Sequence, residues 1–511
     1  MIETRIDSGN ADILIIAEGT YPFVRGGVAA WIYDIIEKMP DFNFGVIFLG
    51  AYPGLYKENV YPIPGNLTQL QLVYLFDEKK EHEEESYTVV NNNQAFDEMY
   101  KMHEVFKQSH SCPHGLIEPI VDIGEVIQPL TGYDNTQFLH NEMTWNYITE
   151  QYTKHSTDPS FVNYFWNIRN MHTPLWQLEE ALRNTPKAKV VHTISTGYAG
   201  LLASMIHQRY GYPLILSEHG LYTKERNIEL LHSTMFAEPE KLLADLKSFT
   251  YQHQLWLNFF DSLARICYDY ADLIVSLYSS AQKQQVFAGA DISKARVIAN
   301  GVDIPKFAAL RRPISCPTPK IVCFVGRFVR IKDIKTFIRS VAIMFEKDDS
   351  IVAWIKTVGK GDNEYIQECK DYIDLLGLNN KIQFIIEGDM FDILAQIGLL
   401  ILTSISEGMP LVMLESLAAG IPVIATDVGA CREIIEGCNE EDRSLGKCGE
   451  IVSISNAVML ADAAVKFLND RYLWLAAQQT GIQRVEKYYN QTVMIDIYKK
   501  IYQKAIKKWP E

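Results

Sequence analysis

Two acidic side chains, Glu407 and Glu415, stand eight positions apart within residues 401–426, which read I-L-T-S-I-S-E-G-M-P-L-V-M-L-E-S-L-A-A-G-I-P-V-I-A-T. An apolar run, a polar turn, an amphipathic segment and a second apolar run predict a strand, a loop, a helix and a strand in a parallel sheet. Glu407 then lies at the carboxyl end of a strand, where open parallel sheets bind ligands. Carboxylates there would repel a diphosphate, so we expect them to bind the hydroxyls of a sugar or a ribose. The alternative is that Glu407 caps the helix and Glu415 is a solvated helix residue.

Pro410 and Gly420 mark the two ends of the predicted helix in this stretch. Proline is favoured in the first turn because its missing N–H group would be unpaired there anyway, and glycine commonly follows the last turn. The free N–H groups at such a helix start suit a phosphate.

Two basic side chains, Arg327 and Lys332, follow a buried strand predicted at residues 321–325, with Gly326 between the strand and the cations. Arginine supplies a fork of donors and lysine a compact charge. The helix that follows adds free N–H groups at its start. The order of strand, glycine, two cations and helix predicts a diphosphate site, and the alternative is a pair of basic residues on a solvated turn.

Gly26 and Gly27 follow a predicted buried strand at residues 12–18 and open an amphipathic helix. A backbone without side chains lets amide N–H groups point at an anion, so this loop is a candidate phosphate cradle. A Gly-Gly pair alone is weak evidence, because a tight turn also needs glycine.

Two histidines, His192 and His219, lie near predicted strand ends. His219 comes directly after the strand at residues 213–217, where a titratable side chain is a candidate for a site; the alternative is a turn histidine. For His192, which has apolar neighbours, a core role is equally favoured. A later strand and helix span residues 271–286, with Ser279 or Ser280 expected as the N-cap.

The stretch 401–426 resembles the E-x7-E signature of retaining, nucleotide-sugar-dependent glycosyltransferases of family 4, which have the GT-B fold. Both glutamates, the glycine and proline after Glu407, the small residues 418–420 and the Pro-Val pair at 422–423 stand in register with that signature. The resemblance implies that Glu407 holds sugar hydroxyls, Glu415 the ribose, and His219 the sugar or the reacting centre, so the candidate catalytic residues are Glu407 and His219. It places the nucleobase near the end of a strand at residues 381–388. The donor-binding residues that it implies are Gly26, Gly27, Arg327, Lys332, Glu387, Gly408, Met409, Pro410, Leu411 and Glu415.

Three further runs narrow the resemblance to the PelF-type transferases of Pel exopolysaccharide biosynthesis, a branch of family 4. They are G-G-V-A-A-W at 26–31, H-T-I-S-T-G-Y-A-G at 192–200 and S-E-H-G-L-Y-T-K-E-R at 217–226. This resemblance implies a uridine nucleotide sugar as donor substrate, a saccharide acceptor and association with a membrane-embedded polysaccharide synthase complex. It covers several separate stretches, and residues 51–150 contribute least.

The fold class expected is α/β, a GT-B arrangement of two Rossmann-like domains facing a central cleft. Residues 1–303 would form the N-terminal acceptor domain, with a helical insertion at about 51–175 that includes a run of charges. Residues 304–319, which hold four prolines, would be the linker. Residues 320–485 would form the nucleotide-sugar-binding domain, and residues 486–511 a C-terminal helix that returns to the N-terminal domain.

Bulk composition excludes several classes of function. The 511 residues are 48% hydrophobic, which suffices for a large core, and a formal charge of −15 argues against a nucleic-acid partner. No cysteines form a C-x2-C pair and no D-x-D triplet occurs, so we expect no metal and no cofactor. Neither a signal peptide nor an apolar run near the ~20 residues of a membrane span is visible. We therefore expect a cytoplasmic protein, at most peripheral at the inner face of the membrane.

These expectations combine into a retaining, metal-independent transfer of a hexosyl unit from a UDP-sugar to a saccharide. Retention in this family is drawn as a front-face reaction that needs no enzyme nucleophile. The alternatives are another GT-B activity, namely a sugar-nucleotide epimerase or a phosphorylase, and a catalytically inactive nucleotide-sugar-binding partner.

Overall fold

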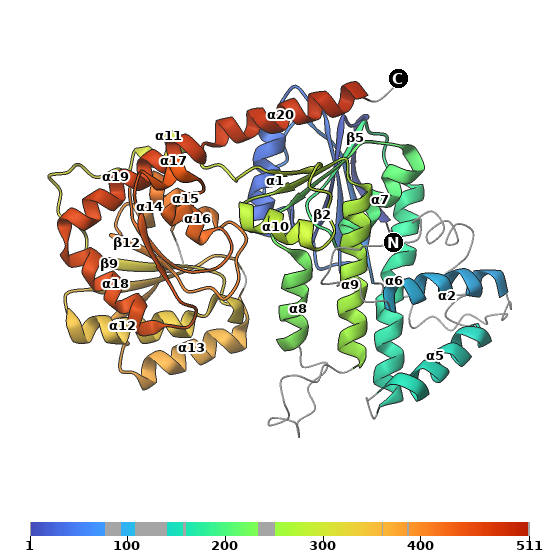
Figure 1. Cartoon of the computed structure of the whole chain (residues 1–511), viewed down its shortest axis with the longest axis horizontal. Coiled ribbons are helices and arrows are strands. Elements are labelled where there is room, and N and C mark those ends of the chain that lie inside the picture. Colours follow the sequence, from blue (N-terminus) through green and yellow to red (C-terminus); the bar gives the residue numbers. More distant parts are fainter. Residues whose placement is uncertain are drawn as a thin grey trace.

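The computed structural model describes residues 2–76, 93–107, 141–156, 160–232, 251–359, 361–385 and 388–508. It contains two α/β domains, each built on its own sheet, with the GT-B arrangement that the sequence predicts (Figure 1). The predicted nucleobase residue Glu387 and the charge run at residues 77–85 lie outside the described residues.

The N-terminal sheet has the strand order β1-β4-β3-β2-β5-β6-β7-β8. All pairs are parallel except β1 with β4, which is antiparallel. The strands are β1 (Ile2–Asp7), β2 (Ile13–Glu18), β3 (Phe44–Gly50), β4 (Leu67–Tyr74), β5 (Val190–Thr193), β6 (Leu214–Glu218), β7 (Leu273–Ser276) and β8 (Ala295–Val297). The central strands are buried on both faces, which explains their uninterrupted apolar sequences.

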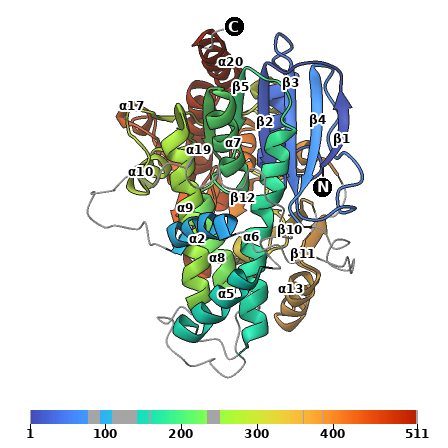
Figure 2. The ribbon, with the colours of Figure 1, turned by 90° about the vertical axis from the view of Figure 1, so that its right-hand side faces the viewer.

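Helices cover this sheet and extend below it, as Figure 2 shows for α5, α6, α8 and α9. They are α1 (Gly27–Glu37), α2 (Asn93–Lys107), α5 (Glu142–His155), α6 (Phe161–Arg183), α7 (Tyr198–Tyr210), α8 (Tyr222–His232), α9 (Tyr251–Tyr270) and α10 (Ser279–Phe287). The predicted insertion at about 51–175 is wrong in part, because Leu67–Tyr74 is a strand of the sheet paired with β3. Glutamines interrupt its apolar pattern, and Gln71 is buried where it donates to the backbone carbonyl of Asn184.

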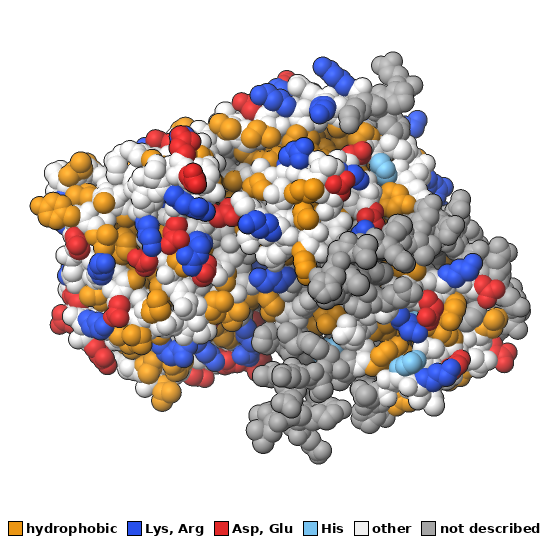
Figure 3. Space-filling view, in the orientation of Figure 1, with side chains coloured by type: hydrophobic (Ala, Val, Ile, Leu, Met, Phe, Trp, Pro, Cys, Tyr) orange, Lys and Arg blue, Asp and Glu red, His pale blue; other side chains and the backbone are white. Residues whose placement is uncertain are grey.

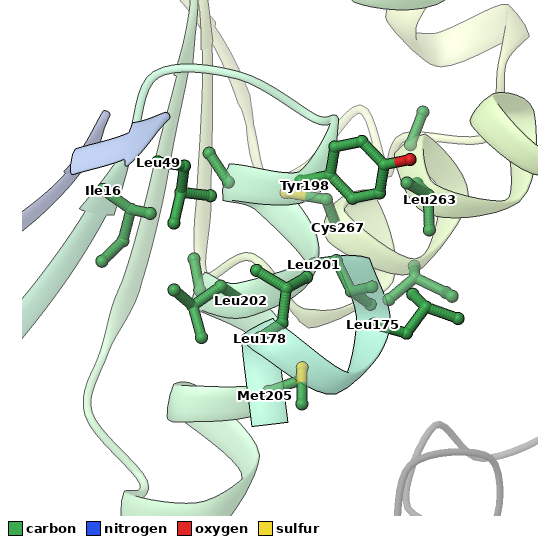
Figure 4. Close-up of a cluster of buried hydrophobic side chains, with 14 of the residues drawn as sticks. Ile16, Leu49, Leu175, Leu178, Tyr198, Leu201, Leu202, Met205, Leu263 and Cys267 are labelled. Carbon is green, nitrogen blue, oxygen red and sulfur yellow. The ribbon is translucent and has the colours of Figure 1, made fainter. Parts of the chain in front are cut away.

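A cluster of apolar side chains packs α6, α7 and α9 onto one face of this sheet (Figure 4). Leu49 comes from β3, Leu175 from α6, Leu201 from α7 and Leu263 from α9, and all four are buried. Each such side chain contributes about 1.5–3 kcal/mol on leaving water. This packing fixes the helices that follow β5 and precede β7, and hence the loops at the carboxyl edge of the sheet.

The C-terminal sheet is entirely parallel, with the order β11-β10-β9-β12-β13-β14. Its strands are β9 (Ile321–Gly326), β10 (Val352–Thr357), β11 (Ile382–Ile385), β12 (Leu399–Leu402), β13 (Val423–Thr426) and β14 (Gly449–Val452). The helices of this domain are η3 (Arg330–Lys332), α12 (Ile334–Lys347), α13 (Asn363–Leu375), α14 (Met390–Leu394), α15 (Leu411–Ala418), α16 (Cys431–Glu436), α17 (Glu440–Arg443), α18 (Ala457–Asn469) and α19 (Arg471–Tyr488).

The chain crosses between the two domains twice, and the two crossings are bonded to each other. The N–H group of Val302 donates to the carbonyl of Tyr489 at 2.8 Å, and the N–H group of Gln491 donates to the carbonyl of Val302 at 3.1 Å. The first crossing continues into α11 (Ile304–Ala308), a short helix at the start of the segment that the sequence predicts as an irregular linker.

The last helix, α20 (Gln491–Lys508), packs on the N-terminal sheet. The buried His192 imidazole contacts the Tyr502 hydroxyl through Nδ1 at 2.7 Å and the Ser217 hydroxyl through Nε2 at 2.8 Å. The Tyr498 hydroxyl lies 2.9 Å from the Ser217 hydroxyl. His192 is therefore a core histidine that anchors α20 to β5 and β6. No helix in the described part of the chain has the length and apolar character to cross a membrane.

Candidate functional site

Glu407 and Lys332 meet at the carboxyl ends of neighbouring strands. β9 and β12 pair side by side, so the loops that follow them are adjacent. Lys332 Nζ lies 2.5 Å from Glu407 Oε1, and the Ser404 hydroxyl donates to the same oxygen at 2.5 Å. The lysine side chain is 20% exposed and that of the glutamate 11%. The sequence predicts separate roles for these two side chains, and the structure joins them as an ion pair.

Backbone contacts hold the two loops in register. The N–H group of Ile405 donates to the carbonyl of Ile331 at 2.8 Å, and the Thr403 hydroxyl donates to the carbonyl of Lys332 at 3.0 Å. The ion pair therefore sits on a loop pair that is fixed by the fold and not by the charges alone.

Arg327 lies at the end of β9 and is exposed. It forms no ion pair with any residue that the structure describes, so its guanidinium is available to an anion. A Cβ added to Gly359 would lie 3.9 Å from the side chain of Arg327. The same Cβ would lie 4.0 Å from the carbonyl oxygen of Arg25, which belongs to the other domain. The glycine loop of the N-terminal domain therefore approaches the cations of the C-terminal domain.

Gly27 is the first residue of α1, and Gly26 before it is the N-cap, which has no side chain to bond the first N–H groups. The Tyr61 hydroxyl lies 3.4 Å from the Gly26 amide nitrogen and 3.3 Å from its carbonyl oxygen. A Cβ on Gly27 would lie 3.6 Å from Leu411 Cδ1, at the start of α15. The contact of Tyr61 with this loop could not be predicted from the sequence, because the residue stands alone in a segment without a recognisable pattern.

His219 faces the loop that carries Glu407. A Cβ on Gly408 would lie 2.1 Å from the carbonyl oxygen of His219, so only glycine permits this approach. The imidazole packs edge-on against Trp31 of α1, with ring centroids 4.6 Å apart. Among the described residues, neither His219 Nε2 nor Trp31 Nε1 has a hydrogen-bond partner, although both are buried. Such orphaned atoms call for an explanation, and a bound ligand supplies one.

Burial lowers the pKa of His219 to about 3. The imidazole is therefore neutral near neutral pH and can act as a hydrogen-bond donor or acceptor, but not as a resident cation. Trp31 was not recognised from sequence, although its position one turn after Gly27 on the apolar face of α1 was a signal.

Glu415 is half-buried on α15. Burial raises its pKa to about 7, and the carboxylates of Asp389 and Asp34 add to that rise, whereas Lys306 opposes it. A carboxyl group in this state can accept a hydrogen bond from a hydroxyl or donate one to it. Such an environment is compatible with the predicted ribose contact.

Three further residues singled out in the sequence lie at or next to the ends of α15. Pro410 is the N-cap of this helix, one position before the first turn where the sequence placed it. Met409 is buried and its sulfur accepts the N–H group of Asn300 at 3.3 Å, so this side chain packs against the N-terminal domain. Gly420 follows the helix with φ 76°, as the sequence predicts for a helix end.

Glu218, beside His219, serves the core instead of the site. Its buried carboxylate accepts hydrogen bonds from the hydroxyl of Tyr268 at 2.9 Å, the side-chain amide of Gln285 at 2.9 Å and the hydroxyl of Thr196 at 3.2 Å. Within the ranges that the structure describes, no group of three or more His, Cys, Asp or Glu side chains is arranged to hold a metal ion.

The predicted N-cap of α10 is wrong. Its N-cap is Tyr278, and neither Ser279 nor Ser280 caps the helix with its side chain. The carboxylate of Glu433, from the other domain, accepts both serine N–H groups instead. A cap that comes from the other domain leaves no local signal in the sequence.

A family model described as "Domain of unknown function (DUF3492)" matches residues 11–293, more than half of the chain. A second model, described as "Glycosyl transferases group 1", matches residues 319–470. The chain is 29% identical over 205 residues to the lipopolysaccharide core biosynthesis mannosyltransferase LpsB of Rhizobium meliloti, which covers 37% of this chain and 55% of the relative. It is 26% identical over 245 residues to a D-inositol 3-phosphate glycosyltransferase of Corynebacterium urealyticum, covering 44% and 56%. The chain thus spans about half the length of these curated relatives.

Two solved structures share the fold over nearly the whole chain. The structure of Anabaena HepE in complex with UDP and glucose superposes with a TM-score of 0.57 at 14% identity, covering 96% of this chain and 99% of the other. Sucrose-phosphate synthase from Thermosynechococcus elongatus also superposes with a TM-score of 0.57 at 14% identity, covering 96% and 98%. At this identity the likeness establishes the fold.

Proposed function

We propose that this chain, which belongs to the family described as "Domain of unknown function (DUF3492)", is a glycosyltransferase that moves a hexosyl unit from a UDP-sugar to a saccharide acceptor. The observation that carries the proposal is the close approach of Gly408 to the His219 carbonyl. It brings the Glu407 and Lys332 pair of one domain to the histidine and the glycine loop of the other. The match of residues 319–470 to group 1 glycosyl transferases supports the same conclusion.

The proposed reaction assigns a role to each side chain around the bond that breaks. Arg327 and Lys332 hold the diphosphate and offset the charge that grows on it as the bond between the sugar and the phosphate breaks. Glu407, which gives up Lys332 to the diphosphate, accepts hydroxyl groups of the transferred sugar. Neutral His219 offers its unpaired ring nitrogen to the sugar or the acceptor, and Glu415 binds the ribose.

The transfer proceeds with retention in this proposal. The acceptor oxygen forms the new bond to the sugar carbon on the face that the leaving diphosphate vacates, and its proton passes to the leaving phosphate oxygen. No side chain needs to attack the sugar. The two cations support a diphosphate held without a metal, and the resemblance in residues 401–426 supports retention.

We further propose that the enzyme acts in Pel-type exopolysaccharide biosynthesis. It would work at the cytoplasmic face of the membrane, in association with a membrane-embedded synthase. The resemblance of the runs around Gly26, His192 and His219 to PelF-type transferases supports it. For the nucleotide, the neighbouring Anabaena structure holds UDP and glucose, which is the donor chemistry proposed here.

A panel of nucleotide sugars tests this function. Each donor is incubated in EDTA with and without short saccharides, and the release of nucleotide and the transfer of labelled sugar are followed. We expect one UDP-sugar to give transfer that requires the acceptor. Conversion of the sugar without acceptor indicates an epimerase, and binding without turnover indicates an inactive partner. A phosphorylase would consume no nucleotide sugar, but would release a sugar phosphate and a shortened saccharide when inorganic phosphate is added. Activity that is lost in EDTA and restored by Mg²⁺ or Mn²⁺ contradicts metal independence.

A further inference from the structure

One carboxylate of the C-terminal domain ends at a helix start of the N-terminal domain. The side chain of Glu433, on α16, accepts the N–H group of Ser279 at 3.1 Å through Oε1 and that of Ser280 at 3.3 Å. Its second oxygen accepts the Ser279 hydroxyl at 3.3 Å. Because α10 has no side-chain cap of its own, its first N–H groups are satisfied across the domain boundary.

This contact has the chemistry of a strong helix cap. The first N–H groups of a helix lack partners within it and carry partial positive charge, which favours an anion. Hydrogen bonds to a carboxylate are about twice as strong as those between neutral groups. The contact can form only while the two domains stand together, because its partners belong to different domains.

The segment that carries Glu433 also contacts the loop that carries Glu407. The N–H group of Ala430 donates to the carbonyl of Gly408 at 2.9 Å. A Cβ on Gly429 would lie 2.3 Å from the carbonyl oxygens of both Glu407 and Gly408. α16 begins directly after this turn, so one rigid segment contacts the Glu407 loop with its turn and α10 with its helix.

We propose that Glu433 is a positioning residue that holds the N-terminal domain, with His219 and the glycine loop, against the Glu407 loop during transfer. This inference rests on the function proposed above. Glu433 acts through the approach of the two domains and needs no contact with the donor. Its loss should therefore slow the step that requires both domains and spare nucleotide binding to the C-terminal domain.

The test compares Glu433→Ala with Glu436→Gln in the full chain. Glu436 lies on the same helix and pairs with Arg432 and Lys447 at the surface, which makes it a matched control. In Glu433→Ala, hydrogen exchange in a peptide containing Ser279 and Ser280 should accelerate about 10- to 150-fold, and kcat should fall by a factor in the same range. The dissociation constant of UDP, measured by calorimetry, should stay within about twofold, since Arg327 and Lys332 remain. The control should match the wild type in all three.

A second variant approaches the contact from the other domain. Ser279 is the first residue of α10, where proline is tolerated, and Tyr278 is extended at φ −153° and ψ 159°, as a residue before proline should be. Ser279→Pro removes two of the donors to Glu433, the N–H group and the hydroxyl of Ser279, and leaves the helix intact. The double variant with Glu433→Ala should lose no more kcat than the more damaged single variant.

Three results would overturn the proposal. These are unchanged exchange at the start of α10 in Glu433→Ala, unchanged kcat despite faster exchange, and fully additive losses in the double variant. A wild type that transfers no sugar from any donor contradicts the proposed function instead, and the exchange measurement then judges the contact without a substrate.

Discussion

Glu407 shares one carboxylate oxygen between the Lys332 ammonium and the Ser404 hydroxyl, both at 2.5 Å. Its charge therefore offsets that of a cation proposed to bind the diphosphate. A ligand with two negative phosphates competes with Glu407 for Lys332, and the carboxylate can then turn to hydroxyl groups of the sugar. In this way one side chain joins the two halves of the proposed donor site.

We expect Glu407→Gln to reduce kcat about 10- to 150-fold, the value of a charged hydrogen bond of about 1.5–3 kcal/mol. The affinity for free UDP should be unchanged or higher, because the substitution frees Lys332 from its counter-ion. Steady-state kinetics and calorimetry on the same preparation separate the two effects. A collapse of UDP affinity with normal turnover of the bound donor would show that the assigned role is wrong.

The pH dependence of stability tests the buried neutral state of His219. Its pKa is lowered to about 3 from an ordinary value of 6.5 by burial, so between these values the unfolded state binds more protons than the folded state. The free energy of unfolding should therefore fall as pH drops through that window, by at most about 1.4 kcal/mol per pH unit from this residue.

His219→Phe keeps a ring against Trp31 but cannot titrate. We expect its unfolding free energy, from urea titrations, to fall less steeply than that of the wild type between about pH 7 and about pH 5. Equal slopes would mean that the wild-type imidazole is protonated freely in the folded protein.

At the scale of elements, α20 ties the C-terminal end of the chain to the N-terminal sheet through buried polar contacts. Tyr502→Phe removes the partner of His192 Nδ1 and leaves that buried atom unsatisfied, which should cost about 1–3 kcal/mol of stability. Tyr472, which is 87% exposed, provides the control Tyr472→Phe, for which no change is expected. Chemical denaturation of both variants is the measurement, and equal stability would contradict an anchoring role for α20.

The sequence predicts the βα units of the site well because each joins an apolar run to a helix through a loop that contains glycine or proline. β2 with α1, β9 with η3 and α12, and β12 with α15 follow this pattern. The edge strand β1 and its neighbour β4 do not follow this pattern, because polar residues interrupt their apolar sequences and the two strands that pair are far apart in the chain.

Side-chain contacts between separate helices, strands and loops could not be predicted from the sequence. The types and loop positions of Glu407 and Lys332 were informative, yet nothing in either segment shows that the two side chains pair. The same holds for Glu433, whose partners stand more than one hundred positions earlier, and for Trp31, whose role depends on the approach of His219. Hydrogen-bond partners far apart in sequence are set by the packing of whole elements.

At the scale of the whole molecule, the two domains contact each other so closely at Gly408 that a side chain there would collide with the other domain. The Cβ of alanine at position 408 would lie 2.1 Å from the His219 carbonyl oxygen. We expect Gly408→Ala to slow transfer by about 100-fold, as a misplacement near 1 Å can, with UDP affinity nearly kept. Gly65→Ala is the control, because no atom lies within 4 Å of a Cβ at that position. Normal turnover of Gly408→Ala would show that catalysis does not need this approach.

Charge is distributed over the molecule in a way that suits a small anionic ligand better than a polyanion. On the face shown in Figure 3, Lys and Arg side chains stand among Asp and Glu side chains over the C-terminal domain, and those described there gather into no basic stripe. The formal charge is −15. In the proposed site, Arg327 and Lys332 therefore attract the diphosphate locally, against the field of the whole protein.

Calorimetry in EDTA with uridine, UMP and UDP tests this local attraction, and with it the central claim, most directly. The wild type should bind UDP, and Arg327→Ala and Lys332→Ala should each weaken that binding about 10- to 150-fold. The weak affinity for uridine, which has no phosphate, should be nearly the same in all three proteins. A wild type that does not bind UDP, or variants that lose uridine and UDP binding equally, would contradict a nucleotide-sugar site held by these two cations.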